Sequence, residues 1–355
     1  MTRFLSLHRV GLLAALLLVG IATTLHAQTI ATFDLPNSIS TQPAAINQAG
    51  QITGSYVDAV GQHGFLRQAD GTLISFDAPL TFPLGGPTAV TSMNSSGQIV
   101  GYIYSSDVFL DYGFLRQPDG TFKVFGGDCF LGPASASVSL PFQEGITPTA
   151  INDRGQIVGE CGPGIAIDFG FLRQPDGTIT VFEPRPALNP PSTQAIGINS
   201  RGQVTGVYLD GSTFSYRGFL REPDGIITAF DASSSGTKPT AINSRSQITG
   251  NSGNDGFLRQ PDGSIELFYG PNSTSTQPTA INRKGQIVGS YLDTGGANHG
   301  FLRKKNGSIV TLDVPNATNT NPTGINARGE ITGWYSDASG VHGFVRSRNH
   351  DRTAE

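Results

Sequence analysis

Short runs of apolar residues alternate with polar residues and glycines along almost the whole chain, and the pattern repeats. Residues 278–315 show one unit clearly: PTAINRKGQIVGSY, a loop, then HGFLRKKNGSIVTLDVP. Apolar runs of four to six residues bounded by Asn, Gly and Pro are typical of strands. The unit predicts four short antiparallel strands at residues 279–282, 286–291, 300–303 and 308–313. An Asn-x-x-Gly turn joins the first two strands, and a turn that elsewhere reads Pro-Asp-Gly joins the last two.

The tetrapeptide Gly-Phe-Leu-Arg, once Gly-Phe-Val-Arg, marks the third strand of every unit. It begins seven times, at Gly64, Gly113, Gly170, Gly218, Gly256, Gly300 and Gly343. A period of this length indicates an array of similar supersecondary units. Four short antiparallel strands per unit are typical of a β-propeller blade. The chain is therefore predicted to be all-β, with one seven-bladed propeller domain over residues 28–346.

The array is cut in a way that predicts a closed ring. The seventh unit stops after Gly343–Arg346 without its fourth strand, whereas the chain opens with that missing segment, TIATFDLP at residues 29–36. We expect residues 29–34 to pair beside Gly343–Arg346 and complete the last blade. Such closure would protect the terminal edges. An open solenoid is the architectural alternative.

Three recurring residue types have structural interpretations. A glycine in every second strand predicts a close approach of another backbone. Two phenylalanine positions per unit predict packing between blades, and the arginine of each Gly-Phe-Leu-Arg predicts pairing between blades with a carboxylate or backbone carbonyls. The glycines are Gly54, Gly101, Gly159, Gly206, Gly250, Gly289 and Gly333.

Composition agrees with a turn-rich β protein, since the chain has 46 Gly, 22 Pro and only 14% charged residues. Residues 1–27 carry Arg3, His8 and Arg9 before an apolar stretch and end in a small residue, which predicts a signal peptide. A retained anchor helix is the alternative. The mature protein is expected to be a secreted or periplasmic monomer, and residues 347–355 a polar C-terminal tail.

Removing residues 1–27 takes away two basic side chains and no acid, so the net charge changes from −4 to −6. A mildly acidic chain without basic runs is not suited to binding nucleic acid or an anionic membrane. Only Cys129 and Cys161 are present. In an exported protein they predict a disulfide, which would contribute about 3 to 4 kcal/mol. Because no CxxC spacing or nearby histidine accompanies them, neither a metal site nor a cofactor is expected.

The turns between the first and second strands and between the third and fourth strands share one face, the turn face, and are nearly identical. The other connections share the opposite face, the loop face, and differ from unit to unit. Binding residues are usually carried by variable loops on a rigid scaffold, so the loop face is the candidate functional face.

A recurring Tyr-x-Asp motif leads into these loops. Its aspartates have two interpretations: turn formers, or, with the aromatic rings, a sugar-binding rim that gains by repetition. The candidate binding residues are Tyr56, Asp58, Tyr208, Asp210, Tyr291, Asp293, Trp334, Tyr335 and Asp337.

Two other groups have weaker functional interpretations. His63, His299 and His342 fall on neighbouring blades, but equivalent third-strand positions there should lie more than about 10 Å apart, too far for a shared metal. We expect them to order loops. The third unit is the most irregular and carries Glu144, Glu160 and Asp168; Glu144 and Glu160 would be the acid and base of any hydrolytic site.

The segments INxxGQIVGxY and HGFLRxxDGxIxxFD resemble the HAF-type extracellular repeat family of bacterial secreted proteins. The resemblance covers nearly all of the mature chain. This chain departs from the family's His-Ala-Phe tripeptide by a central Gly and retains the His only at His63, His299 and His342. The resemblance implies an exported, propeller-like protein and brings no established activity and no catalytic residues.

Together these patterns favour a secreted, non-catalytic binding or interaction module whose loop face binds a polysaccharide or another protein. A carbohydrate-active hydrolase or lyase on the same scaffold is the alternative.

Overall fold

The computed structural model describes residues 28–79, 86–105, 110–126, 145–162, 168–184 and 192–348. Within these ranges the chain forms strands, turns and loops, and no helix. A helix with the length and apolar character needed to cross a membrane is accordingly not found among them.

Four of the sheets are separate and contain four antiparallel strands each, in chain order. The first is β6 (Thr88–Met93), β7 (Ile99–Ser105), β8 (Leu110–Arg116) and β9 (Phe122–Phe125). The second is β10 (Gly145–Ile151), β11 (Ile157–Gly162), β12 (Phe169–Arg173) and β13 (Ile179–Phe182). The third is β14 (Thr193–Ile198), β15 (Val204–Asp210), β16 (Ser215–Arg221) and β17 (Ile227–Phe230). The fourth is β18 (Lys238–Ile242), β19 (Ile248–Ser252), β20 (Asp255–Arg259) and β21 (Ile265–Phe268).

A twelve-stranded sheet contains the remaining strands. Its three groups of four are β2 (Ser40–Ile46) to β5 (Leu73–Phe76), β22 (Ser273–Ile281) to β25 (Ile309–Thr311), and β26 (Asn319–Ile325) to β28 (Gly340–Arg348) with β1 (Gln28–Phe33). The strands within these groups are β3 (Ile52–Val57), β4 (Gln62–Arg67), β23 (Ile287–Asp293), β24 (Asn298–Arg303) and β27 (Ile331–Asp337). In the strand pairing, neighbouring groups share one parallel bridge each, Ser40 with Val341 and Asn298 with Asn319. Each group is therefore equivalent to one of the separate sheets.

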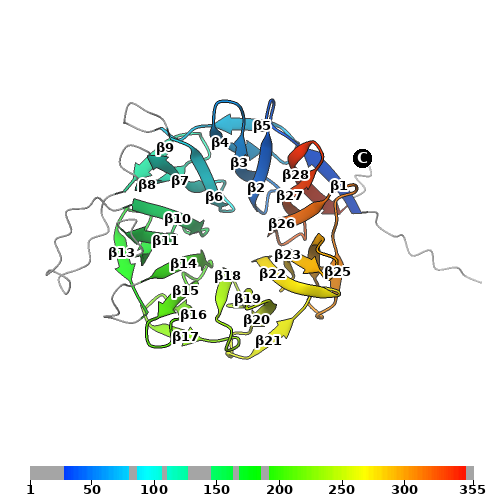
Figure 1. The fold of residues 1–355 in the computed structure, drawn as a ribbon. Coiled ribbons are helices and arrows are strands. Elements are labelled where there is room, and N and C mark those ends of the chain that lie inside the picture. The colour runs from blue at the N-terminus through cyan, green and yellow to red at the C-terminus, as the bar shows by residue number, and fades with distance from the viewer. Residues whose placement is uncertain are drawn as a thin grey trace, which may run out of the picture.

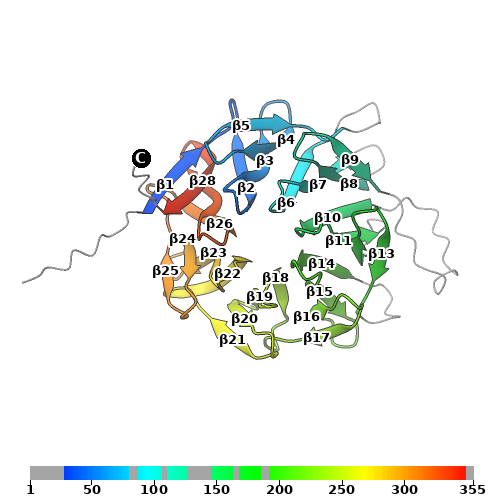
Figure 2. The same ribbon diagram turned by 180° about the vertical axis from the view of Figure 1, so that it is seen from behind.

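The N-terminal strand lies where the split repeat predicts. β1 pairs antiparallel with β28, with Ile30 opposite Arg346 and Phe33 opposite Gly343 (Figure 1). The first and last sheets also contact each other near the centre, where Thr323 Oγ1 donates to the Pro43 carbonyl at 2.9 Å. Figure 2 shows the same arrangement from behind, with blue β1 beside red β28.

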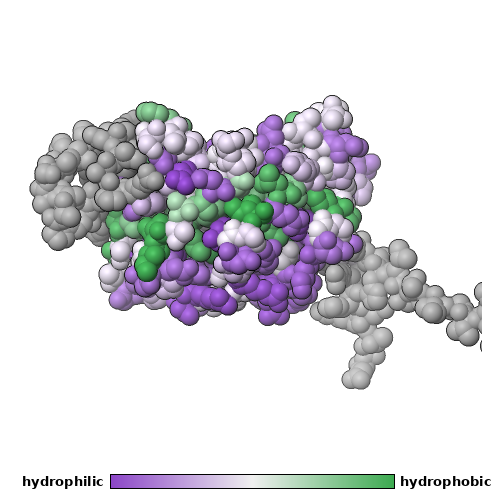
Figure 3. Space-filling view, turned by 90° about the horizontal axis from the view of Figure 1, so that it is seen from below, coloured by the Kyte–Doolittle hydropathy of each residue, from purple (hydrophilic) through white to green (hydrophobic). Residues whose placement is uncertain are grey.

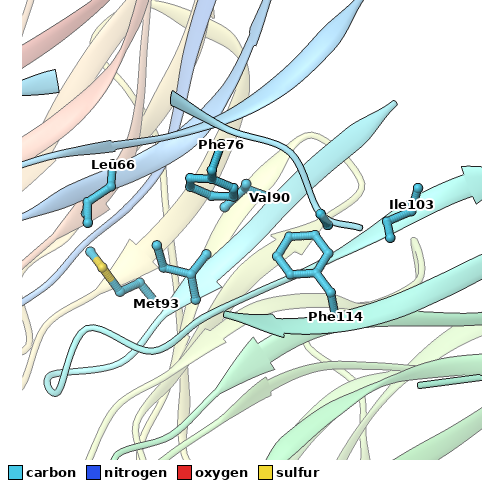
Figure 4. Close-up of a cluster of buried hydrophobic side chains, with 8 residues drawn as sticks. Leu66, Phe76, Val90, Met93, Ile103 and Phe114 are labelled. Atoms are coloured by element: carbon cyan, nitrogen blue, oxygen red, sulfur yellow. The ribbon is translucent and has the colours of Figure 1, made fainter. Parts of the chain in front are cut away.

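The sheets stand around a common centre, with the first strand of each unit innermost and the fourth outermost (Figure 1). The hydrophobic core lies between neighbouring sheets. In one such cluster, Leu66 and Phe76 of one sheet meet Val90, Met93 and Phe114 of the next (Figure 4). Seen from the edge, apolar residues form a band between hydrophilic residues on either side (Figure 3).

The second-strand glycines fit the close approach expected of them. A β-bulge in each first strand pushes a carbonyl oxygen against the glycine, as between Pro43 and Ala45. A Cβ at Gly54 would lie 2.2 Å from the Gln42 backbone oxygen. A Cβ added at any of the other six glycines would lie 2.0 to 2.2 Å from the equivalent backbone oxygen. No side chain fits at these positions.

The recurring aromatic and arginine side chains join adjacent sheets. The phenylalanine of every Gly-Phe-Leu-Arg or Gly-Phe-Val-Arg is fully buried. Phe268 of β21 packs edge-on against Phe301 of β24, with ring centroids 6.1 Å apart, and Arg303 lies 4.9 Å over the same Phe268 ring. Arg303 also pairs with Glu266 at 2.6 Å. The predicted pairing of an arginine with a carboxylate between units is present here, whereas a cation–π contact with the preceding fourth strand is the more general feature.

Asparagine side chains add a second set of contacts between sheets. Asn282 Oδ1 accepts from the Lys284 and Gln286 backbone N–H groups, and its Nδ2 donates to the Asn326 carbonyl at 3.0 Å. Asn326 in turn donates to the Asn47 carbonyl at 3.1 Å, from the last sheet to the first. The Asn-x-x-Gly motif therefore forms a local turn and also fastens that turn to the next unit.

Candidate functional site

The turn face offers little variety for recognition. Its central hollow has a volume of about 510 Å³ and is lined mainly by the Ile-Asn pairs that open each first turn, such as Ile281 and Asn282. The asparagine amides there are already bonded within and between sheets. The loop face carries the non-repeating side chains, and the candidate sites lie on it.

Most of the Tyr-x-Asp tyrosines are inside the protein. Tyr56, Tyr208 and Tyr291 are 8%, 3% and 4% exposed. The Tyr56 hydroxyl bonds Ser75 and the Tyr291 hydroxyl bonds Thr311. Their ring faces are therefore closed to a ligand. Tyr335 is half-buried.

The aspartates of this motif hold loops and histidines. His299 lies between Asp313 at 2.8 Å and Asp293 at 3.4 Å, and its ring stacks on Tyr291 with centroids 5.1 Å apart. Hydrogen bonding to Asp313 raises the pKa of His299, and backbone N–H groups lower the pKa of Asp293. The same arrangement recurs around His63 with Asp58 and around His342 with Asp337. The histidines thus tie the loop after the second strand to the end of the fourth strand.

In the third separate sheet an arginine replaces the histidine. Arg217 pairs with Asp231 at 2.7 Å and with Asp210 at 3.3 Å. The side-chain hydrogen bond with Asp231 is the largest of the contacts that raise the pKa of Arg217. Its charge is consequently neutralised within the protein.

Trp334 remains a candidate binding residue. It is half-buried and lines a hollow of about 340 Å³ between the last and first sheets. Gln42 and Gln62 line the same hollow, and none of its described lining residues is charged.

The strongly exposed aromatic rings belong to other residues. Phe214 is 84% exposed, Tyr269 58% and Tyr216 41%. Phe214 and Tyr216 both line a groove of about 490 Å³ between the β14–β17 and β18–β21 sheets, which we name the Tyr216 groove. Its described lining residues are Phe214, Ser215, Tyr216, Ser234, Ser235, Gly236, Lys238, Asn251 and Gly253.

The wall of the Tyr216 groove is held by buried polar contacts. The Thr237 N–H donates to the Tyr216 carbonyl at 2.8 Å, which fastens the loop after β17 to β16. The buried Thr237 hydroxyl accepts from the Ala232 N–H, and Ser233 bonds the buried Ser252 of β19. A groove fixed in this way would lose little further conformational freedom on binding a ligand.

Lys238 is the only charged residue among the described lining of this groove. Its ammonium lies 4.8 Å from the centre of the Tyr216 ring. No described carboxylate lies within ion-pair distance of it. Asn251 lies opposite Lys238 in the strand register and adds an amide.

An acidic cluster of Asp111, Glu160 and Asp168 lies elsewhere on the loop face. Burial and the nearby Asp168 charge raise the pKa of Glu160 to about 7, and one Glu160 oxygen is buried without a hydrogen-bond partner. Burial also raises the pKa of Asp168 and of Asp111, which accepts from Thr147 at 2.9 Å. A half-buried carboxyl with such a pKa is suited to proton transfer.

Other predicted residues lie partly outside the described part of the chain. Cys129 and Glu144 fall there, so the structure describes neither the Cys129–Cys161 disulfide nor the Glu144–Glu160 pair; Cys161 itself is 2% exposed. The described residues contain no group of His, Cys, Asp and Glu side chains arranged to hold a metal ion.

Sequence reasoning missed Asp111, Phe214, Tyr216 and Lys238. The signal for the last two lies in the departures of each unit from the repeat. Each first strand has one residue whose backbone oxygen faces the second-strand glycine. That residue is Lys238 in this unit and is uncharged in the others, as at Gln42, Thr147 and Asn321. Phe214 lies in a loop and has no counterpart to compare.

No family model matches the chain, and no curated protein matches it. Solved structures do resemble it. Virginiamycin B lyase from Staphylococcus aureus has a TM-score of 0.58 at 16% identity, over 90% of this chain and 100% of that one. A streptogramin B lyase has 0.56 at 15%, over 90% and 98%. YCF48 from Cyanidioschyzon merolae has 0.52 at 11%, over 89% and 98%.

These neighbours are β-propeller proteins, so the chain has a propeller scaffold of four-stranded antiparallel sheets. At such low identity the likeness concerns the fold alone, and binding and catalysis must be argued from the side chains.

Proposed function

We propose that the chain is an exported, seven-bladed β-propeller in which β1 closes the ring. The pairing of β1 with β28 and the bonds from the last sheet to Pro43 and Asn47 support closure. The three four-stranded groups of the large sheet, added to the four separate sheets, support a count of seven blades. Residues 1–27 would be the signal peptide, Cys129 and Cys161 a disulfide, and the repeat a variant of the HAF type.

We infer that this propeller is a non-catalytic module that binds polysaccharide in the Tyr216 groove. The observation that carries the proposal is the exposed pair Phe214 and Tyr216 beside a rigid wall of hydroxyl and amide groups. Aromatic faces stack on the C–H faces of sugar rings, and the surrounding Ser, Asn and Lys side chains satisfy sugar hydroxyls. Binding another protein through the same face is the alternative occupant.

Retention on a panel of immobilised plant, algal and bacterial polysaccharides tests this proposal. Phe214→Ala and Tyr216→Ala should each weaken retention of the bound polymer about tenfold or more, since stacked aromatic rings dominate such sites. Ile226→Ala is the matched control, because Ile226 is 63% exposed on the turn face of the same sheet. Retention of the two variants equal to that of the parent protein would overturn the assignment of the groove.

The acidic cluster favours a second candidate function, a carbohydrate-active hydrolase or lyase. The buried, partnerless oxygen of Glu160 and its raised pKa support it. In that case the protein would release shortened or unsaturated sugars from a retained polymer, and Glu160→Gln would abolish release while retention persists. Retention without any product from the parent protein supports the binding module instead.

A further inference from the structure

The backbone conformation and the exposure of Phe214 argue against a structural role for its side chain. Its backbone φ is 52°, in the left-handed region that a bulky L-residue rarely adopts, and 84% of the residue is exposed. The turn is closed by the Phe214 N–H, which donates to the Asp210 carbonyl at 2.7 Å. An exposed aromatic side chain on a strained backbone contributes little to the stability of the fold. Contact with a ligand would explain why a phenylalanine stands here.

The charge of the groove indicates which kind of sugar it would bind. Lys238 presents an ammonium with no described carboxylate in ion-pair distance, whereas nearby Arg217 is saturated by Asp210 and Asp231. Every other described residue that lines the groove is neutral. An anionic group on the sugar would therefore meet one positive charge at a fixed place, held against the Tyr216 ring.

The number of charged residues in the groove indicates which class of anionic polymer fits it. A single lysine among otherwise neutral lining residues matches a polymer with a single carboxylate on each sugar. A heavily sulfated polymer would need several basic residues, whereas the described lining of the groove has one.

We propose, on the basis of the function inferred above, that the Tyr216 groove binds a polyuronate: a sugar ring stacks on the Phe214 and Tyr216 side chains while its carboxylate pairs with Lys238. The groove thereby distinguishes an acidic sugar from its neutral ester.

Affinity electrophoresis with polygalacturonate, its fully methylated ester and dextran sulfate tests this inference. The parent protein should bind polygalacturonate about tenfold more tightly than the ester, as expected for one charge-assisted hydrogen bond. Lys238→Met keeps the aliphatic stem but should abolish the difference, and Lys238→Arg should preserve it. Lys284→Met, at an exposed lysine of the turn face, is the control and should change nothing.

The outcomes separate the two proposals. Equal binding of acid and ester, stronger binding of dextran sulfate, or an unchanged preference in Lys238→Met would overturn the polyuronate inference and leave the broader proposal of a polysaccharide-binding module standing. Binding of none of the polymers, here or in the wider panel, would overturn both.

Discussion

Single residues explain both the constancy of the repeat and its exceptions. Phe301 and Arg303 recur in equivalent form in every unit because each blade must pack on the next. Their structural role can be predicted from the sequence, because a residue that recurs in all seven units is required by the packing common to all units. Phe214 and Lys238 have no equivalent in the other units, so the scaffold does not require them.

The recurrent tyrosines show where sequence reasoning reached its limit. Tyr56 and Tyr291 precede aspartates at the edge of variable loops, which suggested an exposed rim. Alternation along a strand places a residue on one of two sides, but both sides of an inner blade strand are covered by neighbouring blades. Only the packing of His63 and His299 on these rings reveals that they are closed.

Glu160 gives a prediction for the pH dependence of stability. Its pKa in the folded protein is about 7, above the ordinary value of 4.5, so the folded state retains the proton over this interval. The contribution of Glu160 to stability is therefore complete below pH 4.5 and is lost as pH rises through about 7.

Glu160→Gln should remove this slope. At about pH 8 the variant should be more stable than the parent by about 2 kcal/mol, a value reduced for solvent screening at a half-buried group. Urea unfolding from about pH 4 to pH 8 measures the difference. An identical pH profile in both proteins would show that Glu160 ionises normally.

At the scale of the strands, the main features of the repeat are predictable, whereas their lengths are not. The predicted first strand at residues 279–282 extends in the structure over β22 (Ser273–Ile281), and the fourth strand shrinks to β25 (Ile309–Thr311). The longer strand results from pairing of Ser273 and Ser275 with β23 across a bulge. Such pairing depends on the partner strand, which the local pattern of apolar residues does not describe.

The bulged pairing of β2 with β3 makes a sharp prediction. Gly54→Ala places a Cβ 2.2 Å from the Gln42 oxygen and 2.7 Å from the Pro43 Cα, so the two strands must separate. We expect a loss of about 2 to 4 kcal/mol in the free energy of unfolding. Gly61→Ala, in the loop between β3 and β4, is the matched control, since nothing lies within 4 Å of its added Cβ, and it should change stability by less than about 0.5 kcal/mol. Urea denaturation of both variants decides; equal effects would exclude the steric explanation.

For the whole molecule, the sequence contains an architectural statement in its two ends. The unit at Gly343 lacks a fourth strand and residues 29–34 supply one, a relation visible without coordinates because repeats can be aligned with each other. The side-by-side placement of β1 and β28 agrees with it. The Tyr216 groove is different in kind. The bond that fastens the loop after β17 to Tyr216 recurs in other units, as between Thr276 and Asn254, but the exposed Phe214 and Lys238 side chains do not.

Removal of β1 tests the closure. Deletion of residues 28–34 would leave the β28 edge unpaired and uncover Phe344, which is fully buried. We expect the melting temperature to fall by about 10 °C or more. A synthetic peptide of residues 29–36 added in trans should restore most of the loss, whereas the same peptide with Phe33→Ser should not. An unaltered melting temperature after deletion would contradict the proposed closure of the propeller by this strand.

We propose that a polysaccharide binds between the β14–β17 and β18–β21 sheets, on side chains that the repeat does not share. A crystal structure of the protein with an oligogalacturonate tests it most directly. We predict a sugar ring against Phe214 and Tyr216, with its carboxylate in contact with the Lys238 ammonium. An oligosaccharide bound only beside Trp334 or at the Glu160 cluster, with the Tyr216 groove empty, would contradict the account.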